Sequence, residues 1–104
     1  MNQLRLELAS LLIDLEFEMR SLNLWSDQAP ATGALQSEQP FCIDTLSFDQ
    51  WLQFVFLPKL HQILDAGLEL PGQCNVAPIA EEYFGSRAPA VLHCLDRIDR
   101  LLTT

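Results

Sequence analysis

Apolar residues recur every three or four positions along the first part of the chain. Residues 2–22 contain no glycine or proline, and acidic residues and serines follow the same rhythm on the opposite side. This spacing predicts an amphipathic α-helix over residues 2–22. Its apolar stripe consists of Leu4, Leu8, Leu11, Leu15, Met19 and Leu22, widened by Leu12.

Residues 23–46 lose this periodicity. They hold Pro30, Gly33 and Pro40 among small and polar residues, which favours a connection without regular structure. A loop of this length is unusual in a small domain and is often functional. We expect four apolar residues to anchor it, namely Trp25, Leu35, Phe41 and Ile43.

A second helix is predicted over residues 48–66. Ser47 and Gln50 have the spacing of a capping box, and Leu46 and Trp51 occupy the matching hydrophobic-staple positions. Together these residues indicate where the helix begins.

Pro58 interrupts this second helix. It has no N–H to donate to the carbonyl of Phe54, and its ring clashes with that turn, so the helix must kink or restart. At about 100° per residue, the apolar sides before and after Pro58 differ in direction by roughly 120°. Either the break re-aims the second half, or the helix is packed on several sides. Gly67 suits the left-handed residue that ends many helices.

The next stretch, residues 68–77, is rich in turn formers. Pro78 suits the first position of a short helix over residues 79–84. We place Glu81 and Glu82 in its first turns, where the helix dipole favours acidic side chains.

A last helix is expected over residues 88–102, with Ser86 as a possible N-cap. No pair of strands is indicated anywhere in the sequence. The order of helix, long loop, helix, short helix and helix therefore favours an all-α antiparallel bundle, formed by one domain over residues 1–104.

The composition narrows the function. The 104 residues are 49% apolar, which suffices for the core of one small domain. Six Lys and Arg against fourteen Asp and Glu give a net charge of −8, and the basic residues are scattered. A protein that binds the phosphate backbone needs clustered Lys and Arg, so direct nucleic-acid binding is not expected. An acidic surface suits solubility or a basic partner.

Cysteine usage and hydropathy indicate a cytoplasmic protein without a membrane span. Cys42, Cys74 and Cys94 form no CxxC pair and are odd in number, so we expect buried thiols rather than disulfides or a zinc site. The N-terminal residues do not form a signal peptide, and no stretch reaches about 18 uncharged apolar residues.

The middle of the chain resembles a known family. The strings QPFCIDT, WLQFVFLPKLHQILD and LPGQCNVAP are similar to the YqcC-like family of small uncharacterised bacterial proteins, and the resemblance implies a four-helix up-and-down bundle. The matching positions are Gln39, Pro40, Phe41, Asp44, Thr45, Trp51, Leu52, Gln53, Pro58, His61, Leu64, Asp65, Leu70, Pro71, Val76, Ala77 and Pro78.

The resemblance implies no established activity. Genes of that family are often found beside that of a tRNA pseudouridine synthase, and some family labels borrow its name. Such synthases are larger mixed α/β enzymes built around a catalytic Asp, and Asp44 alone is no evidence for that activity. A helical chain of charge −8 supplies neither that architecture nor an RNA-binding surface. We therefore interpret the label as marking a neighbour or a partner.

Patterns typical of catalysis or metal binding are weak in this sequence. His61 and Asp65 are four apart, which is typical of a surface pair, although the same spacing could hold an imidazole for acid–base chemistry. His93 and Cys94 are adjacent and so do not face each other on a helix. The spacing gives no support to a metal site built from these histidines with Cys74 and Cys94. We expect no cofactor, no metal and no enzymatic activity.

Most aromatic residues lie between positions 25 and 56. We expect Phe48 and Trp51, with Val55 beside them, to belong to the core. A small bundle rarely covers a helix that is apolar on nearly all sides, so an aromatic groove open to partners is the alternative for Trp25, Phe41 and Phe54.

The leading hypothesis is a non-catalytic protein-interaction module, accessory to an RNA-modifying enzyme, whose loop and kinked second helix form the binding surface. The candidate surface residues are Trp25, Pro40, Phe41, Asp44, Phe54 and His61. The alternative is a small-molecule-binding protein or cryptic enzyme, with a pocket under loop 23–46 where Asp44, His61 and Cys42 converge. A homodimer that covers the aromatic residues stays open.

Overall fold

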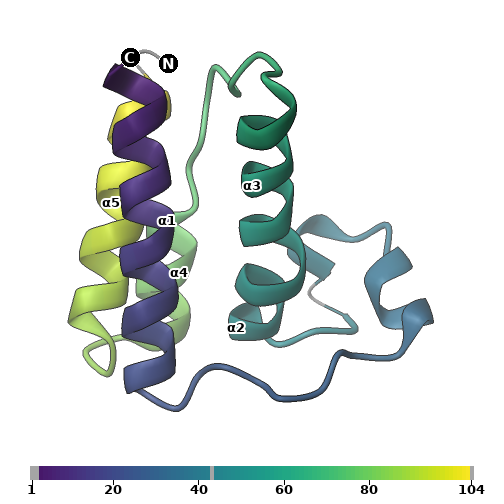
Figure 1. Cartoon of the computed structure of the whole chain (residues 1–104). Coiled ribbons are helices and arrows are strands. Elements are labelled where there is room, and N and C mark those ends of the chain that lie inside the picture. Colours follow the sequence, from purple (N-terminus) through teal and green to yellow (C-terminus); the bar gives the residue numbers. More distant parts are fainter. Residues whose placement is uncertain (1–2, 43, 104) are drawn as a thin grey trace.

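Four antiparallel helical rods build the computed structural model, which describes residues 3–42 and 44–103 (Figure 1). The second rod has three parts, α2, η3 and α3, that follow one another without a break. Successive rods run in opposite directions, which confirms the four-helix up-and-down bundle. The helices are α1 (Gln3–Ser21), α2 (Phe48–Trp51), η3 (Leu52–Phe56), α3 (Leu57–Ala66), α4 (Ala77–Phe84) and α5 (Pro89–Leu102).

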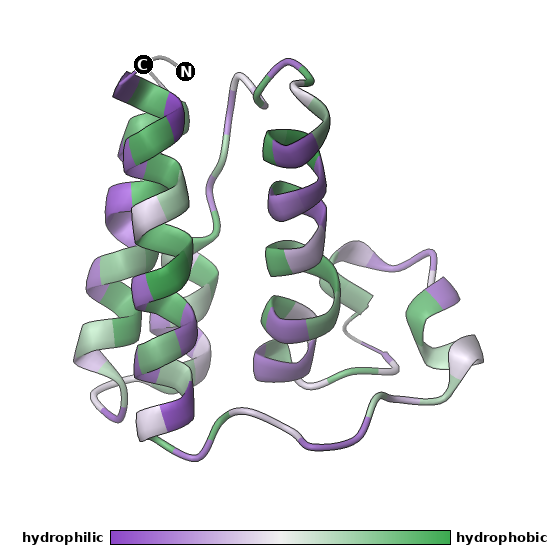
Figure 2. Ribbon diagram, viewed as in Figure 1, coloured by the Kyte–Doolittle hydropathy of each residue, from purple (hydrophilic) through white to green (hydrophobic). Residues whose placement is uncertain are grey.

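The core lies between α1, α5 and the second rod. α1 packs along α5 and against α3, while α4 packs on α5. Figure 2 shows hydrophobic and hydrophilic positions alternating along the helices, as amphipathic helices require. The fully buried side chains of largest volume are Leu8, Leu12, Leu15, Met19, Leu52, Val91, Leu95 and Ile98. None of the described helices is long and apolar enough to cross a membrane.

The predicted helix ends are partly confirmed. The Ser47 N–H donates to Gln50 Oε1 at 3.0 Å, and the Gln50 N–H donates to Ser47 Oγ at 3.4 Å, so the capping box is present. Gly67 ends α3 in the left-handed conformation, with φ of 66°. On α1 the predicted stripe is buried from Leu8 to Met19.

The second rod continues through Pro58. Leu52–Phe56 form a π-helical turn, in which the Leu57 N–H donates to the Leu52 carbonyl. Pro58 then lies in the first turn of α3, where no backbone N–H is required. Phe48 is buried as expected, but Val55 is only half-buried and Phe56 is buried instead, because both lie within the π turn, where the angular spacing of side chains differs from that of an α-helix.

Two expectations about the C-terminal half are wrong. Glu81 and Glu82 are the fifth and sixth residues of α4, outside its first turn, because the helix begins at Ala77. The acidic group at this helix end is Asp99 of α5, which accepts the Ala77 N–H at 2.7 Å. Ser86 does not cap α5.

The start of α5 follows from its proline. Ala88 occupies the cap position without a side-chain hydrogen bond, and it adopts φ of −139°. Pro89 pushes the residue before it out of the helical conformation, so α5 begins at the proline itself.

The long loop contains two short 3₁₀ turns, η1 (Thr32–Gln36) and η2 (Pro40–Cys42). Trp25 and Phe41 pack against the core as predicted, whereas Leu35 is 37% exposed and anchors nothing. Ile43, the remaining predicted anchor, lies outside the described residues.

Candidate functional site: an aromatic groove

Aromatic side chains of η2, α2 and α4 form one cluster. The ring of Phe48 lies 5.7 Å from Trp51 and 5.8 Å from Tyr83, centroid to centroid. Phe84 and Phe41 complete the ring of neighbours at 6.0 and 6.1 Å. Stacked, tilted and edge-on pairs at these distances each contribute about 0.5–1.5 kcal/mol beyond their burial.

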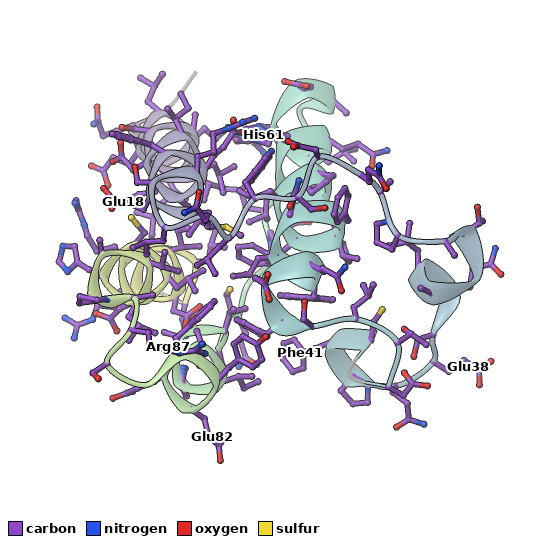
Figure 3. The ribbon with its side chains drawn as sticks, turned by 90° about the horizontal axis from the view of Figure 1, so that it is seen from below. Glu18, Glu38, Phe41, His61, Glu82 and Arg87 are labelled. Carbon is purple, nitrogen blue, oxygen red and sulfur yellow. The ribbon has the colours of Figure 1, made fainter. Side chains whose placement is uncertain are left out.

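A groove of about 460 Å³ opens beside this cluster, between η2, α2 and α4. Most of its wall is apolar, and Tyr83 remains 43% exposed within it. In Figure 3, Phe41 and Glu82 lie toward one side of the view and His61 toward the opposite side. The groove is lined by Phe41, Leu46, Ser47, Phe48, Ile79, Glu82 and Tyr83, and we call it the aromatic groove.

Two local features hold the walls of the aromatic groove in place. The Tyr83 hydroxyl donates to Asp49 Oδ1 at 3.1 Å, which connects α4 to α2. Phe41 has φ of 58°, in the left-handed region that non-glycine residues rarely adopt. This conformation sets its ring 4.9 Å from that of Trp51, edge to face.

The electrostatics of the groove centre on Tyr83. Burial raises the pKa of this phenol above its ordinary value, and the neighbouring Asp49 carboxylate raises it further. The hydroxyl is therefore protonated at neutral pH and donates to Asp49. The Arg87 guanidinium lies 5.8 Å from the Tyr83 ring and donates to the carbonyls of Phe84 and Tyr83 at 3.0 and 2.9 Å.

Only some of the expected surface residues lie near this groove. Phe41 lines it, and Pro40 precedes Phe41 in η2 with its side chain exposed. Asp44 is exposed and accepts a hydrogen bond from the Ser37 hydroxyl. Trp25 is half-buried, with the Arg20 guanidinium 4.6 Å from its ring.

The other expected residues lie elsewhere. Phe54 is half-buried in η3, and His61 lines a second groove of about 480 Å³ together with residues of α1. Cys42, the last residue of η2, is buried. Asp44, His61 and Cys42 therefore do not meet in either of these two grooves. Neither groove supports the expected pocket where the three residues converge.

The sequence analysis missed a second apolar stripe on α1. Leu6, Ile13 and Phe17 are 52%, 66% and 56% exposed, and we call them the α1 stripe. Their spacings of seven and four residues fit one helix face. That signal is visible in the sequence beside the buried stripe. The roles of Ile79, Glu82 and Tyr83 depend on how α4 packs, and no local pattern indicates them.

The thiols are poorly suited to nucleophilic chemistry. All three cysteines are reduced. Burial, together with a hydrogen bond to Asp99 and the charge of that carboxylate, raises the pKa of the Cys74 thiol to about 12. Burial also raises the pKa of Cys94, with Asp14 and Glu18 adding to the effect. A thiol with a raised pKa supplies little thiolate at neutral pH.

The described histidines do not belong to a metal site either. Within residues 3–42 and 44–103, no group of three or more His, Cys, Asp or Glu side chains is arranged to hold a metal ion. His61 is half-buried beside α1, and Asp65 on the next turn is exposed.

The fold and its groove thus define a small helical bundle with an open aromatic surface. Residues 7–101 match the family DUF446, described as "tRNA pseudouridine synthase C", and the chain belongs to this family. It is 33% identical over 103 residues to the uncharacterised protein YqcC of Escherichia coli K12, covering 96% of this chain and 91% of that one. The solution NMR structure of E. coli YqcC superposes with a TM-score of 0.84 at 30% identity, covering 98% of this chain and 90% of that one. The expected resemblance is confirmed.

Two other relatives match over shorter stretches. An uncharacterised protein of Haemophilus influenzae is 44% identical over 68 residues, which cover 65% of this chain and 64% of that protein. The tRNA pseudouridine synthase C of Pectobacterium carotovorum is 42% identical over 60 residues, 58% of this chain. Those 60 residues are only 16% of that relative, so most of the protein that bears the synthase name lies outside the match.

Proposed function

We propose that this chain is a non-catalytic protein-interaction module that binds its partner through the aromatic groove, as an accessory to an RNA-modifying enzyme. The observation that carries the proposal is the groove itself. Its walls are aromatic and apolar, it is open to solvent, and Tyr83 and Phe41 present ring area at its surface. Aromatic side chains in such settings dominate the energetics of protein interfaces.

The relative named as a synthase supports the choice of partner. The 60 matched residues are 16% of that protein, so a segment similar to part of this chain is joined there to a longer polypeptide. Joining two modules raises their effective concentration for one another, which favours pairs that act together.

Charge supports the same choice. An enzyme that modifies RNA needs Lys and Arg to neutralise phosphates, so it carries a basic surface. A chain of net charge −8 is attracted to such a surface. The same charge disfavours direct contact between this chain and the RNA.

The test is calorimetric titration of the full chain with the purified tRNA pseudouridine synthase of the same organism. Tyr83→Ala should weaken binding by about tenfold, because it removes an aromatic anchor from the groove. Phe17→Ala, which truncates a more exposed aromatic residue on α1, should leave the affinity unchanged. Absence of any heat of binding to the synthase would contradict the proposal.

Small-molecule binding is the second candidate, and the size of the groove favours it. A volume of about 460 Å³ lies within the range of ligand pockets, roughly 300–1,000 Å³. A metabolite library screened by thermal shift tests this function, because a ligand that binds only the folded state raises the melting temperature. A hit whose effect persists in Tyr83→Ala would place the ligand elsewhere.

A further inference from the structure

We infer that the occupant of the aromatic groove is a basic amphipathic segment of the partner protein. An apolar side chain of this segment fills the groove, and a neighbouring Lys or Arg lies along Tyr83 toward Glu82 and Asp49. The inference rests on the proposed function and specifies the chemistry that the groove recognises.

The apolar walls of the aromatic groove favour an apolar side chain of the partner segment. Phe41, Phe48 and Ile79 come from three different elements and meet around one hollow. A side chain of Leu or Phe size placed there removes apolar surface from water on both partners. The cluster beneath is packed ring against ring, so the groove presents a preformed surface.

The basic part follows from the charges around the groove. Glu82 is exposed and lines the groove. The Asp49 carboxylate lies beside the groove, because it accepts the hydroxyl hydrogen of Tyr83. Asp44, also exposed, lies two residues before Leu46 of the groove wall. Arg87 is the basic residue beside the site, and its guanidinium is engaged by the carbonyls of Tyr83 and Phe84. These carbonyls are neutral, so Arg87 keeps its positive charge. Glu82 and Asp49 outnumber it, and the net charge that a partner meets here is negative.

The molecule already places cations on its aromatic rings. Arg20 lies 4.6 Å from the Trp25 ring centroid, and Arg87 lies 5.8 Å from that of Tyr83. Tyr83 is nevertheless 43% exposed, which leaves ring area for a cation supplied by a partner. Contacts of this kind contribute about 0.5–1 kcal/mol at exposed sites.

The α1 stripe is the competing surface. Ile13 and Phe17 are more exposed than Tyr83, and they border the second groove. The acid of that groove, Glu16, already pairs with Arg20 at 2.9 Å. Phe17 also lines a hollow with Asp14 and Glu18, so charge alone does not choose between the two surfaces. The packed aromatic cluster beneath the aromatic groove favours that site.

The experiment is an NMR titration of the ¹⁵N-labelled full chain with synthetic helical peptides of Leu and Lys, and with matched peptides in which Gln or Glu replaces every Lys. The Lys peptide should shift the amides of Phe41, Ile79, Glu82 and Tyr83. It should bind more tightly than the Gln peptide, and the Glu peptide should not bind.

Two neighbouring acids provide a matched pair of variants. Glu82→Gln should weaken the Lys peptide by about two- to fivefold, as expected for an exposed ion pair. Glu81→Gln removes the same charge from the same helix, but Glu81 lines a different hollow beside Cys74 and Asp99, so its effect should be smaller. Tyr83→Ala should weaken the peptide by about tenfold while the circular dichroism spectrum is retained.

Three results of the peptide titrations would overturn the inference. These are equal affinity for the Lys and Gln peptides, equal effects of the two Glu variants, or shifts centred on Ile13 and Phe17. A short single-stranded RNA that shifts the groove amides would also contradict it.

The outcome separates this inference from the proposed function. A synthase that binds the chain through the groove, while the Lys and Gln peptides bind with equal affinity, leaves the proposed function standing and removes the inference. A Lys peptide that binds the groove while the synthase does not leaves the chemistry standing and removes the partner.

Discussion

Asp99 determines where α4 sits, although it belongs to α5. Its carboxylate is 8% exposed and accepts the backbone N–H groups of Val76 and Ala77 at 3.0 and 2.7 Å. These donors belong to the start of α4, where a negative charge also interacts favourably with the helix dipole. Because α4 carries Tyr83, this contact positions one wall of the aromatic groove.

Asp99→Ala should lower the free energy of unfolding by about 2–3 kcal/mol, because two charge-assisted hydrogen bonds to a buried helix end are lost. Urea unfolding followed by circular dichroism measures the change. Asp96→Ala is the matched control, since Asp96 makes only an exposed ion pair with Arg100, worth about 0.5 kcal/mol or less. Equal effects of the two variants would show that the Asp99 contact is not stabilising.

Cys74 gives the stability a dependence on alkaline pH. Burial and Asp99 raise the pKa of its thiol to about 12, against an ordinary value of 9.0. The folded protein therefore holds this proton more tightly than the unfolded chain. The contribution is fully present below about pH 9 and is lost as the pH rises toward 12.

Urea unfolding between pH 8 and 10.5 should show stability falling more steeply in the native sequence than in Cys74→Ala. In the folded protein at pH 8, iodoacetamide should alkylate Cys74 slowly, and the rate should rise in 8 M urea. Rapid alkylation of folded Cys74 at pH 8 would contradict the raised pKa.

The π turn keeps the apolar side of the second rod in register. A turn with i→i+5 hydrogen bonds holds about one extra residue, which shifts the downstream face by roughly 100°. This nearly cancels the difference of roughly 120° that uniform α-helical spacing predicts across Pro58. Phe48, Leu52, Phe56 and Leu60 are all buried as a result. The π turn thus re-aims the second half without breaking the rod, which corresponds to the first of the two expected alternatives.

Pro58→Ala should change the free energy of unfolding by less than about 1 kcal/mol, because the π turn already accommodates the proline in the first turn of α3. A proline inside a regular helix is destabilising by about 3 kcal/mol or more. An increase of about 3 kcal/mol in the free energy of unfolding, measured by urea unfolding, would show that Pro58 strains the rod.

A polar side chain fastens the start of the long loop to the second rod. The Gln53 amide accepts the Ser26 N–H and donates to the Ser26 carbonyl, both at 2.8 Å, although Gln53 is only 8% exposed. The sequence predicted apolar anchors for this loop. A buried amide that bonds a backbone 27 residues away leaves no local pattern.

Gln53→Met keeps the size of the side chain and removes both hydrogen bonds. It should lower the free energy of unfolding by about 1–2 kcal/mol and speed hydrogen exchange at the Ser26 amide. Exchange in α5 should stay unchanged in the same sample. An unaltered rate at Ser26 would show that other contacts hold the loop.

Across the whole molecule, local signals predicted the helices and tertiary contacts decided their details. The periodicity of α1, the capping box at Ser47 and the left-handed Gly67 depend on neighbours in sequence, and all three are confirmed. The start of α4 depends on Asp99 from another helix, and the expected positions of Glu81 and Glu82 were wrong for that reason.

The proposed binding surface was predicted only in part for the same reason. Phe41 was expected at a binding surface, and it lines the groove. Its partners Ile79 and Tyr83 come from α4, and their approach to α2 is a property of the packed bundle. His61 was also expected at the binding surface, but it lines the second groove, beside α1.

Hydrogen exchange measured by mass spectrometry, on the full chain with and without the tRNA pseudouridine synthase of the same organism, tests the docking surface most directly. The account predicts slower exchange in residues 41–48 and 79–84, which carry the aromatic groove, and unchanged exchange in residues 6–17. Protection confined to residues 6–17, or no protection anywhere at saturating synthase, would contradict it.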